Sequence, residues 1–183
     1  MNTVHTLREY VDALRDVGIL VESTVSDELA AREIHCLTYD TRALSEDALF
    51  ICKGAHFKEE YLCDALSRGA IAYVAEKKHN VDVPCLLVND IRYSLVVLGQ
   101  LFYNHVTDKL TSVGITGTKG KSTTAYYVRY ILNDWLRAQS MPECAILSSI
   151  DNYDGKSTEE SHITTPEVLE LYQHFENAYE SGI

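Results

Sequence analysis

The residues with the clearest chemical meaning cluster in the second half of the chain, where Gly117, Gly120, Lys121 and Ser122 follow one another closely. Glycines allow backbone N–H groups to converge on an anion, and a lysine beside them can reach the outer phosphates of a nucleotide. A serine hydroxyl at the next position can ligate Mg²⁺. This spacing predicts a phosphate-binding loop, with Lys121 as the charged contact and Ser122 as the metal ligand.

The strict pattern for such a loop, G-x-x-x-x-G-K-[ST], is met except at its first position, where Ile115 stands in place of glycine. The prediction therefore depends on the G-K-S core and on its context, because residues 110–116 are typical of a strand and residues 122–137 of a helix. The alternative is a glycine-rich turn between strand and helix that binds no ligand. Lys119 has two alternative roles, either as a second phosphate contact or as a solvated surface charge.

The first half of the chain alternates between helical and strand patterns. Thr6 and Glu9 match a capping box, and apolar residues then recur at helical spacing, so we expect a helix over residues 7–17. Short apolar runs predict strands at residues 34–38, 48–52, 70–75 and 84–88. Helical patterns lie at residues 59–67 and from the cap Asp90 to residue 102. This alternation predicts an α/β domain over residues 1–108.

A second unit is expected over residues 109–183. Its pattern predicts a strand at 110–116, a helix at 122–137, a strand at 144–148 and a loop at 151–157 around Asp154-Gly155. A final helix is predicted over residues 166–179, with Thr165 at its cap and Pro166 at its first position. Two strands are too few for a doubly wound sheet, so we expect the first part of a larger nucleotide-binding domain.

Composition narrows the possible partners and the cellular setting. The formal net charge of -11 argues against nonspecific binding to nucleic acid or to an anionic membrane surface. No apolar run approaches the ~20 residues that cross a bilayer, and the start lacks the pattern of a secretory signal. The five cysteines are odd in number and lack metal-ligand spacing, which fits a reduced, cytoplasmic protein.

Four segments carry a family resemblance. Residues 116–124 read T-G-T-K-G-K-S-T-T and resemble the ATP-binding signature T-G-T-[NK]-G-K-[ST]-[ST] of the Mur ligases. Three further segments are similar, in the same order, to the tripeptide-synthesising members of that family. They are Y-D-T-R at 39–42 with A-L-F at 48–50, K-G at 53–54 leading to G-A-I-A at 69–72, and H-I-T-T-P-E at 162–167. The resemblance covers about residue 35 to the end.

The resemblance implies a small α/β domain for a UDP-linked precursor, followed by the start of a central ATPase domain. It implies an ATP-dependent amide ligase of peptidoglycan synthesis that adds a diamino acid, lysine or diaminopimelate, to UDP-MurNAc-L-Ala-D-Glu. ATP and Mg²⁺ are the implied cofactors. We expect the chain alone to be inactive, because the family's amino-acid-recognition segment and later Mg²⁺ ligand are not found in it. The alternative is a stand-alone nucleotide or UDP-sugar binding module, and a phosphate-loop kinase fits less well.

The resemblance also assigns roles to individual residues. The ATP-binding residues are Gly117, Thr118, Lys119, Gly120, Lys121, Ser122 and Thr123, with Lys121 catalytic and Ser122 on the metal. The residues that contact the UDP-linked precursor are Thr41, Thr164 and Thr165, and the segment A-H-F at 55–57 lies where further contacts are made.

Structural roles compete with several of these assignments. Thr41 can bond its own turn at a strand end, and Thr165 can simply cap a helix. Arg42 is open between pairing with Asp40 and meeting a diphosphate.

Overall fold

The computed structural model describes residues 3–54, 57–161 and 163–183. Their contacts divide the chain into two compact units, Met1–Asn104 and His105–Ile183, whereas the sequence pattern placed the boundary at residue 108. Within the described residues, no helix combines the length and the apolar character needed to cross a membrane.

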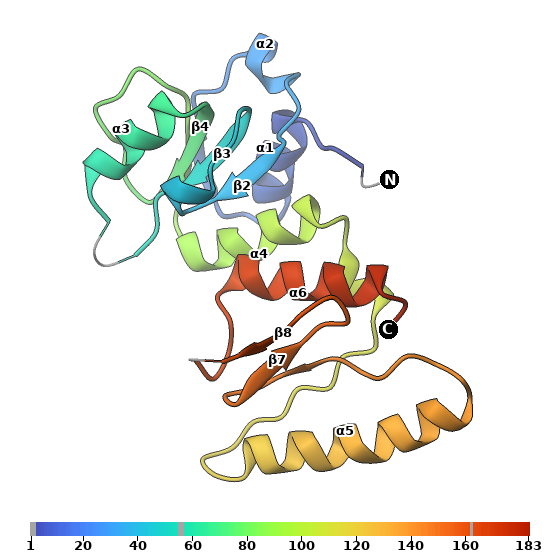
Figure 1. The fold of residues 1–183 in the computed structure, drawn as a ribbon. Coiled ribbons are helices and arrows are strands. Elements are labelled where there is room, and N and C mark those ends of the chain that lie inside the picture. Colours follow the sequence, from blue (N-terminus) through green and yellow to red (C-terminus); the bar gives the residue numbers. More distant parts are fainter. Residues whose placement is uncertain (1–2, 55–56, 162) are drawn as a thin grey trace. The chain divides into compact units, whose positions relative to one another are not determined.

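The first unit is built on a five-stranded sheet with the order β1-β5-β4-β3-β2 (Figure 1). The strands are β1 (Leu20–Ser23), β2 (Cys36–Thr38), β3 (Ala48–Ile51), β4 (Ala70–Ala75) and β5 (Cys85–Val88). Strands β2 to β5 run parallel to their neighbours, and β1 joins the edge beside β5 in the antiparallel direction. Every residue of β3 is buried, as expected for a parallel strand covered on both faces.

Helices cover both faces of this sheet. On one face, Ala48 and Phe50 of β3 pack with Leu62 and Ala65 of α3 (Glu59–Ser67). On the other, α1 (Leu7–Asp16) contacts α4 (Ile91–Phe102), whose buried residues continue the core. The short α2 (Asp27–Ala30) and the 3-10 turn η1 (Thr41–Ala43) complete the unit. This is a three-layer α/β arrangement (Figure 1).

The predicted α/β fold class of this unit is confirmed, with element bounds within two residues of those expected. The capping box of Thr6 and Glu9 is present at the start of α1. Asp90 accepts hydrogen bonds from the backbone N–H groups of Arg92 and Tyr93 at the start of α4. Strand β1 was not predicted, because its four residues alternate weakly and are only partly buried at the sheet edge.

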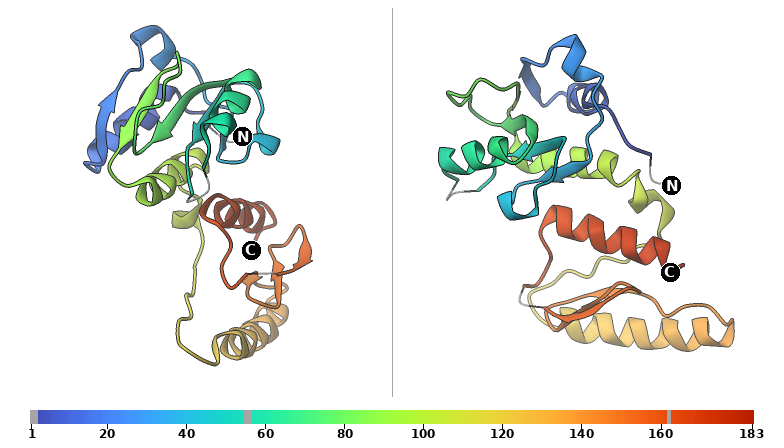
Figure 2. Two further views of the ribbon diagram at one scale, coloured as in Figure 1. Left: turned by 90° about the vertical axis from the view of Figure 1, so that its left-hand side faces the viewer. Right: turned by 45° about the horizontal axis from the view of Figure 1, so that its top comes forward.

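The second unit contains a small antiparallel sheet between two helices (Figure 2). Its elements are the 3-10 turn η2 (Val106–Lys109), α5 (Lys121–Ala138), β6 (Ile146–Leu147), β7 (Asp151–Tyr153), β8 (Thr158–Glu160) and α6 (Val168–Glu180). The strand order is β6-β7-β8, with both pairs antiparallel. Helix α5 confirms the helix predicted after the glycine-rich segment.

Three predictions for the second unit are wrong, and two of them concern strands. Residues 110–116 form no strand, because no strand in the described part of the chain pairs with their backbone. Residues 151–157 are not all loop, because Asp151–Tyr153 pairs with Thr158–Glu160 in a hairpin around Asp154-Gly155. The strand predicted at 144–148 is present in part, as β6.

The third error concerns the start of the last helix. Thr165 is not its cap, because α6 begins at Val168 with Glu167 in the capping position. The Glu167 carboxylate accepts from the backbone of Glu170, and the Glu170 side chain accepts from the backbone of Glu167. This reciprocal pair satisfies the first helical N–H groups without Thr165, which leaves that hydroxyl exposed.

Candidate nucleotide-binding site

The glycine-rich segment forms a tight turn that leads directly into α5. Gly120 is the residue before the helix and has φ +78°, a left-handed conformation that glycine adopts without steric cost. The Gly120 carbonyl accepts from the backbone N–H of Thr124 at 2.9 Å, which is the first bond of the helix. The Lys121 ammonium donates to the Gly117 carbonyl at 2.8 Å.

The start of α5 offers a favourable environment for an anion. The first N–H groups of any α-helix lack carbonyl partners within the helix, and the helix dipole adds partial positive charge at that end. Helix α5 is 18 residues long, so this field is fully developed at Lys121 and Ser122. The geometry suits a phosphate at the glycine-rich turn.

A cavity of about 760 Å³ in the second unit joins this turn to a distant segment. Its lining includes Gly117, Lys121 and Ser122 together with Thr164 and Thr165. The structure therefore brings two sequence-predicted groups to one space, although more than forty positions separate them. Because both segments carry polar hydroxyls or charge, the cavity can accept a polar ligand between them.

One further hydroxyl near this cavity was not predicted. The Ser149 hydroxyl lies 2.9 Å from that of Ser122, and both residues line the cavity. Ser149 follows the predicted strand at residues 144–148, and residues directly after a strand are frequent binding positions in α/β proteins. That position was the available sequence signal.

The remaining predicted nucleotide contacts lie at the edge of the site. Thr118 and Lys119 are exposed and do not line the cavity. Thr123 is also exposed and faces a separate cavity of about 740 Å³ along α5. The exposed position of Lys119 is compatible with either a solvated charge or a contact to the outer part of a nucleotide.

Thr41 lies in the first unit, directly after β2, at the start of η1. Its side chain is hydrogen-bonded to Asp64 of α3. The hydrogen bonds from Arg68 and then Thr41 hold the pKa of the Asp64 carboxyl below its usual value. Thr38 stabilises the turn after β2: its hydroxyl accepts from the Asp40 backbone N–H at 3.0 Å and lies 3.2 Å from the Asp40 carbonyl oxygen, to which it donates. Thr41 is therefore not needed to bond its own turn.

Arg42 pairs with Asp40 rather than remaining free. Its Nε and Nη2 donate to the two carboxylate oxygens at 3.0 and 2.7 Å. The Arg42 side chain and backbone hold the pKa of Asp40 below its usual value. Of the two alternatives for Arg42, the structure contains the ion pair.

The segment at 55–57 is described only in part, because Ala55 and His56 lie outside the described residues. The Phe57 side chain packs against the core beside α3, with its ring centroid 6.4 Å from that of Tyr61 and 5.3 Å from that of His79. Phe57 therefore has a packing role in this structure.

The fold and the site together are those of a two-unit α/β protein with a glycine-rich turn of the kind that can hold phosphate. The chain is an α/β protein with a helix-flanked, mostly parallel sheet in one unit. Its other unit carries a basic, glycine-rich turn at the start of a long helix, next to a largely apolar cavity to which polar side chains of two segments contribute.

Comparison with known proteins places the chain within this class. Residues 115–183 match the model of the Mur ligase middle domain. The UDP-N-acetylmuramoyl-L-alanyl-D-glutamate--L-lysine ligase of Enterococcus faecalis is 40% identical over 162 residues, which cover 87% of this chain and 31% of the relative. The ligase of the same name from Streptococcus agalactiae serotype V is 41% identical over 80% of this chain and 29% of its own length. The chain belongs to the Mur ligase family, and the resemblance predicted from its motifs is confirmed.

Solved structures agree at the level of the fold. A UDP-N-acetylmuramoyl-L-alanyl-D-glutamate--2,6-diaminopimelate ligase matches 98% of this chain and 34% of its own, with a TM-score of 0.66 and 17% identity. MurF from Acinetobacter baumannii matches 72% of this chain and 28% of its own, with a TM-score of 0.52 and 22% identity. The chain spans about a third of the length of the curated relatives that it matches.

Proposed function

We propose that this chain provides the precursor-binding and ATP-binding part of an ATP-dependent amide ligase of peptidoglycan synthesis. The observation behind this proposal is the shared cavity, in which Lys121 and Ser122 lie with Thr164 and Thr165. The first pair suits the phosphates of a nucleotide, and the family resemblance assigns the second pair to the UDP-linked precursor. A phosphoryl donor and its acceptor carboxylate must lie close together for transfer, so a common cavity supports this chemistry.

The residues of the glycine-rich turn take distinct roles in this proposal. Backbone N–H groups of residues 117–122 and the start of α5 hold the ATP phosphates, with Thr118, Lys119 and Thr123 at the edge of the nucleotide. Lys121 exchanges the Gly117 carbonyl for a phosphate oxygen and neutralises its charge.

Ser122 is the proposed Mg²⁺ ligand. Its hydroxyl is half-buried at the cavity, with the Ser149 hydroxyl 2.9 Å away, and hydroxyl oxygens are among the hard donors that Mg²⁺ accepts. When bound, Mg²⁺ supplies neutralising charge to the transferring phosphates.

For the precursor, we propose UDP-MurNAc-L-Ala-D-Glu, contacted by Thr41, Thr164 and Thr165. For the incoming amine, we propose L-lysine, because the curated relatives at 40% and 41% identity are named as L-lysine ligases. The reaction belongs to the cytoplasm, where ATP is available and thiols stay reduced.

Paired calorimetric titrations test the two binding roles. We expect the chain to bind both ATP with Mg²⁺ and UDP-MurNAc-L-Ala-D-Glu. The Lys121→Ala variant should lose ATP affinity only, and Thr41→Val should lose precursor affinity only. Lys77→Ala, which removes an exposed lysine of the first unit, is the matched control and should change neither. A folded wild-type chain that binds neither ligand would contradict the proposal.

A ligation assay on the complete gene product distinguishes the ligase from a binding module. We expect ATP-dependent formation of the UDP-tripeptide with lysine and much less with diaminopimelate. Product with diaminopimelate alone would leave the ligase class standing and overturn the choice of lysine. Binding of both ligands without any ligation would favour the stand-alone module.

A further inference from the structure

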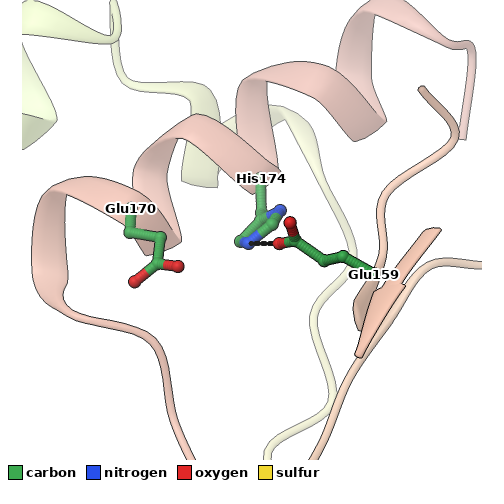
Figure 3. A group of neighbouring side chains, drawn as sticks. All are labelled: Glu159, Glu170 and His174. Carbon is green, nitrogen blue, oxygen red and sulfur yellow. Dashed lines mark ion pairs between the residues drawn. The ribbon is translucent and has the colours of Figure 1, made fainter. Parts of the chain in front are cut away.

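A second polar cluster lies in the second unit and shares no residue with the glycine-rich turn. Figure 3 shows Glu170 and His174 projecting from α6 and Glu159 projecting from β8. Each of the three side chains offers an atom that can bind a metal ion, and these atoms all lie within 4.8 Å of one another. Glu170 and His174 are four positions apart, which places them on the same face of the helix.

The imidazole of His174 is hydrogen-bonded to the buried carboxylate of Asp154. His174 is 7% exposed and Asp154 is 1% exposed, and His174 Nδ1 lies 2.8 Å from Asp154 Oδ2. Asn177 Nδ2 donates to the same oxygen at 2.8 Å, and the backbone N–H groups of Lys156 and Ser157 donate to Oδ1 at 3.0 and 2.9 Å. Asp154 is therefore saturated with donors.

These contacts also fix which ring nitrogen of His174 faces Asp154 as a donor. The Asn177 amide and the two backbone N–H groups all donate to the Asp154 carboxylate, which therefore acts as an acceptor, and Nδ1 of His174 donates to Oδ2.

With Nδ1 bonded to Asp154, Nε2 is the ring nitrogen left for a ligand. Among the described residues, Nε2 is buried and has no hydrogen-bond partner. Its nearest charged neighbour is the Glu159 carboxylate, with Oε1 at 3.5 Å. Two carboxylates whose oxygens lie within 4.8 Å of each other repel, and a buried polar atom without a hydrogen-bond partner is costly. The arrangement is complementary to a cation.

We propose that Glu159, Glu170 and His174 bind a divalent transition-metal ion of the Zn²⁺ type. One imidazole nitrogen and two carboxylate oxygens form a donor set that zinc accepts, with water completing the coordination. Asp154 plays the part of the carboxylate that commonly orients a metal-bound histidine. The imidazole disfavours Mg²⁺ and Ca²⁺, which prefer oxygen ligands.

Glu170 keeps one carboxylate oxygen available to bind a metal ion. Its Oε2 accepts from the Glu167 backbone N–H at 3.3 Å as part of the capping box of α6, and the carboxylate has a second oxygen. Glu159 comes from the neighbouring strand, so a bound ion would connect the β7–β8 hairpin to α6. Asp154 and His174 also line the cavity that contains Thr164 and Thr165. The ion would therefore stabilise one wall of that cavity, and this role does not depend on the function proposed above.

Metal titration of the chain after removal of bound ions tests the site. Zn²⁺ is followed by calorimetry, and Co²⁺ by its visible absorption, with the cysteine thiols blocked beforehand. We expect one equivalent of each ion to bind, and Zn²⁺ to raise the Tm. Glu159→Gln and Glu170→Gln should each weaken binding about tenfold or more and abolish the rise in Tm. Both residues are exposed, so these variants leave the buried pair of Asp154 and His174 in place.

Two controls keep the result specific. Glu160→Gln changes the exposed neighbour on the same strand and should bind the ions as the wild type does. Ser122→Ala removes the proposed Mg²⁺ ligand of the glycine-rich turn and should likewise have no effect. No binding to the wild type, or equal binding by Glu159→Gln, Glu170→Gln and the wild type, would overturn the assignment.

Discussion

The Lys121 ammonium donates a hydrogen bond to the carbonyl oxygen of Gly117 at 2.8 Å and so links the end of the glycine-rich turn to its beginning. This contact keeps the charged group beside the N–H groups at the start of α5, where an anion is favoured. A phosphate oxygen can replace the carbonyl as acceptor, and the contact becomes stronger because both partners are then charged.

Lys121→Ala should therefore weaken ATP binding by about 10- to 100-fold, since a hydrogen bond to a charged group contributes about 1.5–3 kcal/mol. The first unit should unfold as in the wild type. Titration with ATP and Mg²⁺ measures the loss. Lys119→Ala, measured in parallel, separates the two alternatives for that residue: a clear loss indicates a phosphate contact, and no loss indicates a solvated charge. Unchanged affinity in Lys121→Ala would refute the role of Lys121.

Thr41→Val should weaken binding of UDP-MurNAc-L-Ala-D-Glu several-fold and leave ATP binding unchanged. The substitution keeps the shape of the side chain and removes one hydroxyl, whose lost hydrogen bond costs about 1 kcal/mol. Because Thr41 also bonds Asp64, an Asp64→Asn variant is the control for an indirect effect. If Thr41→Val binds the precursor as the wild type does, the hydroxyl serves only its contact with α3.

The chain by itself should form no amide bond. It spans 31% of the length of its Enterococcus faecalis relative, and none of its residues has a proposed role in binding the incoming amine. Incubation with ATP, Mg²⁺, lysine and the UDP-linked dipeptide, followed by chromatography, measures the product. The relative from Enterococcus faecalis provides the positive control. Steady accumulation of UDP-tripeptide with the chain alone would show that this expectation is wrong.

The start of α1 should contribute pH-dependent stability to the first unit. The Glu9 carboxylate accepts from His5 Nδ1 at 2.8 Å and from the Thr6 backbone N–H at 2.7 Å. The hydrogen bond from His5, followed by that from Thr6, holds the pKa of Glu9 below its usual value. A depressed folded-state pKa means that the contribution is present above the unfolded pKa and is lost as pH falls through the folded pKa.

Glu9→Ala should accordingly lower the free energy of unfolding by about 1 kcal/mol at neutral pH, the usual size of a capping interaction. The difference from the wild type should shrink below about pH 4, where the carboxyl becomes protonated. Denaturant titrations at several pH values measure it. Glu60→Ala, an exposed carboxylate on α3, is the control and should show a much smaller dependence on pH. A difference that stays constant from neutral to acidic pH would contradict a lowered pKa of Glu9 in the folded state.

Local patterns in the sequence were enough for much of the first unit. Thr6 and Asp90 cap helices through residues two or three positions further along the chain, so their effect can be predicted from spacing. Strand β4 can be predicted because it is a short, continuous apolar run. The family motifs also specified the class of protein, because the glycine-rich turn and the T-T-P-E segment recur in order. Such short-range signals do not depend on the course of the rest of the chain.

The three-dimensional arrangement decided the features that depend on distant partners. Residues 110–116 have the composition of a strand, yet a strand exists only where another backbone pairs with it. Glu167 displaced Thr165 as the helix cap because it can exchange hydrogen bonds with Glu170. The buried pair of Asp154 and His174, with Glu159 facing it, has no signature in the chain, because folding brings together residues from a turn, a strand and a helix. The sequence by itself determined the longer helices, the buried strands of the first unit and the glycine-rich motif before α5, and tertiary structure alone decided which strands pair and which polar groups meet.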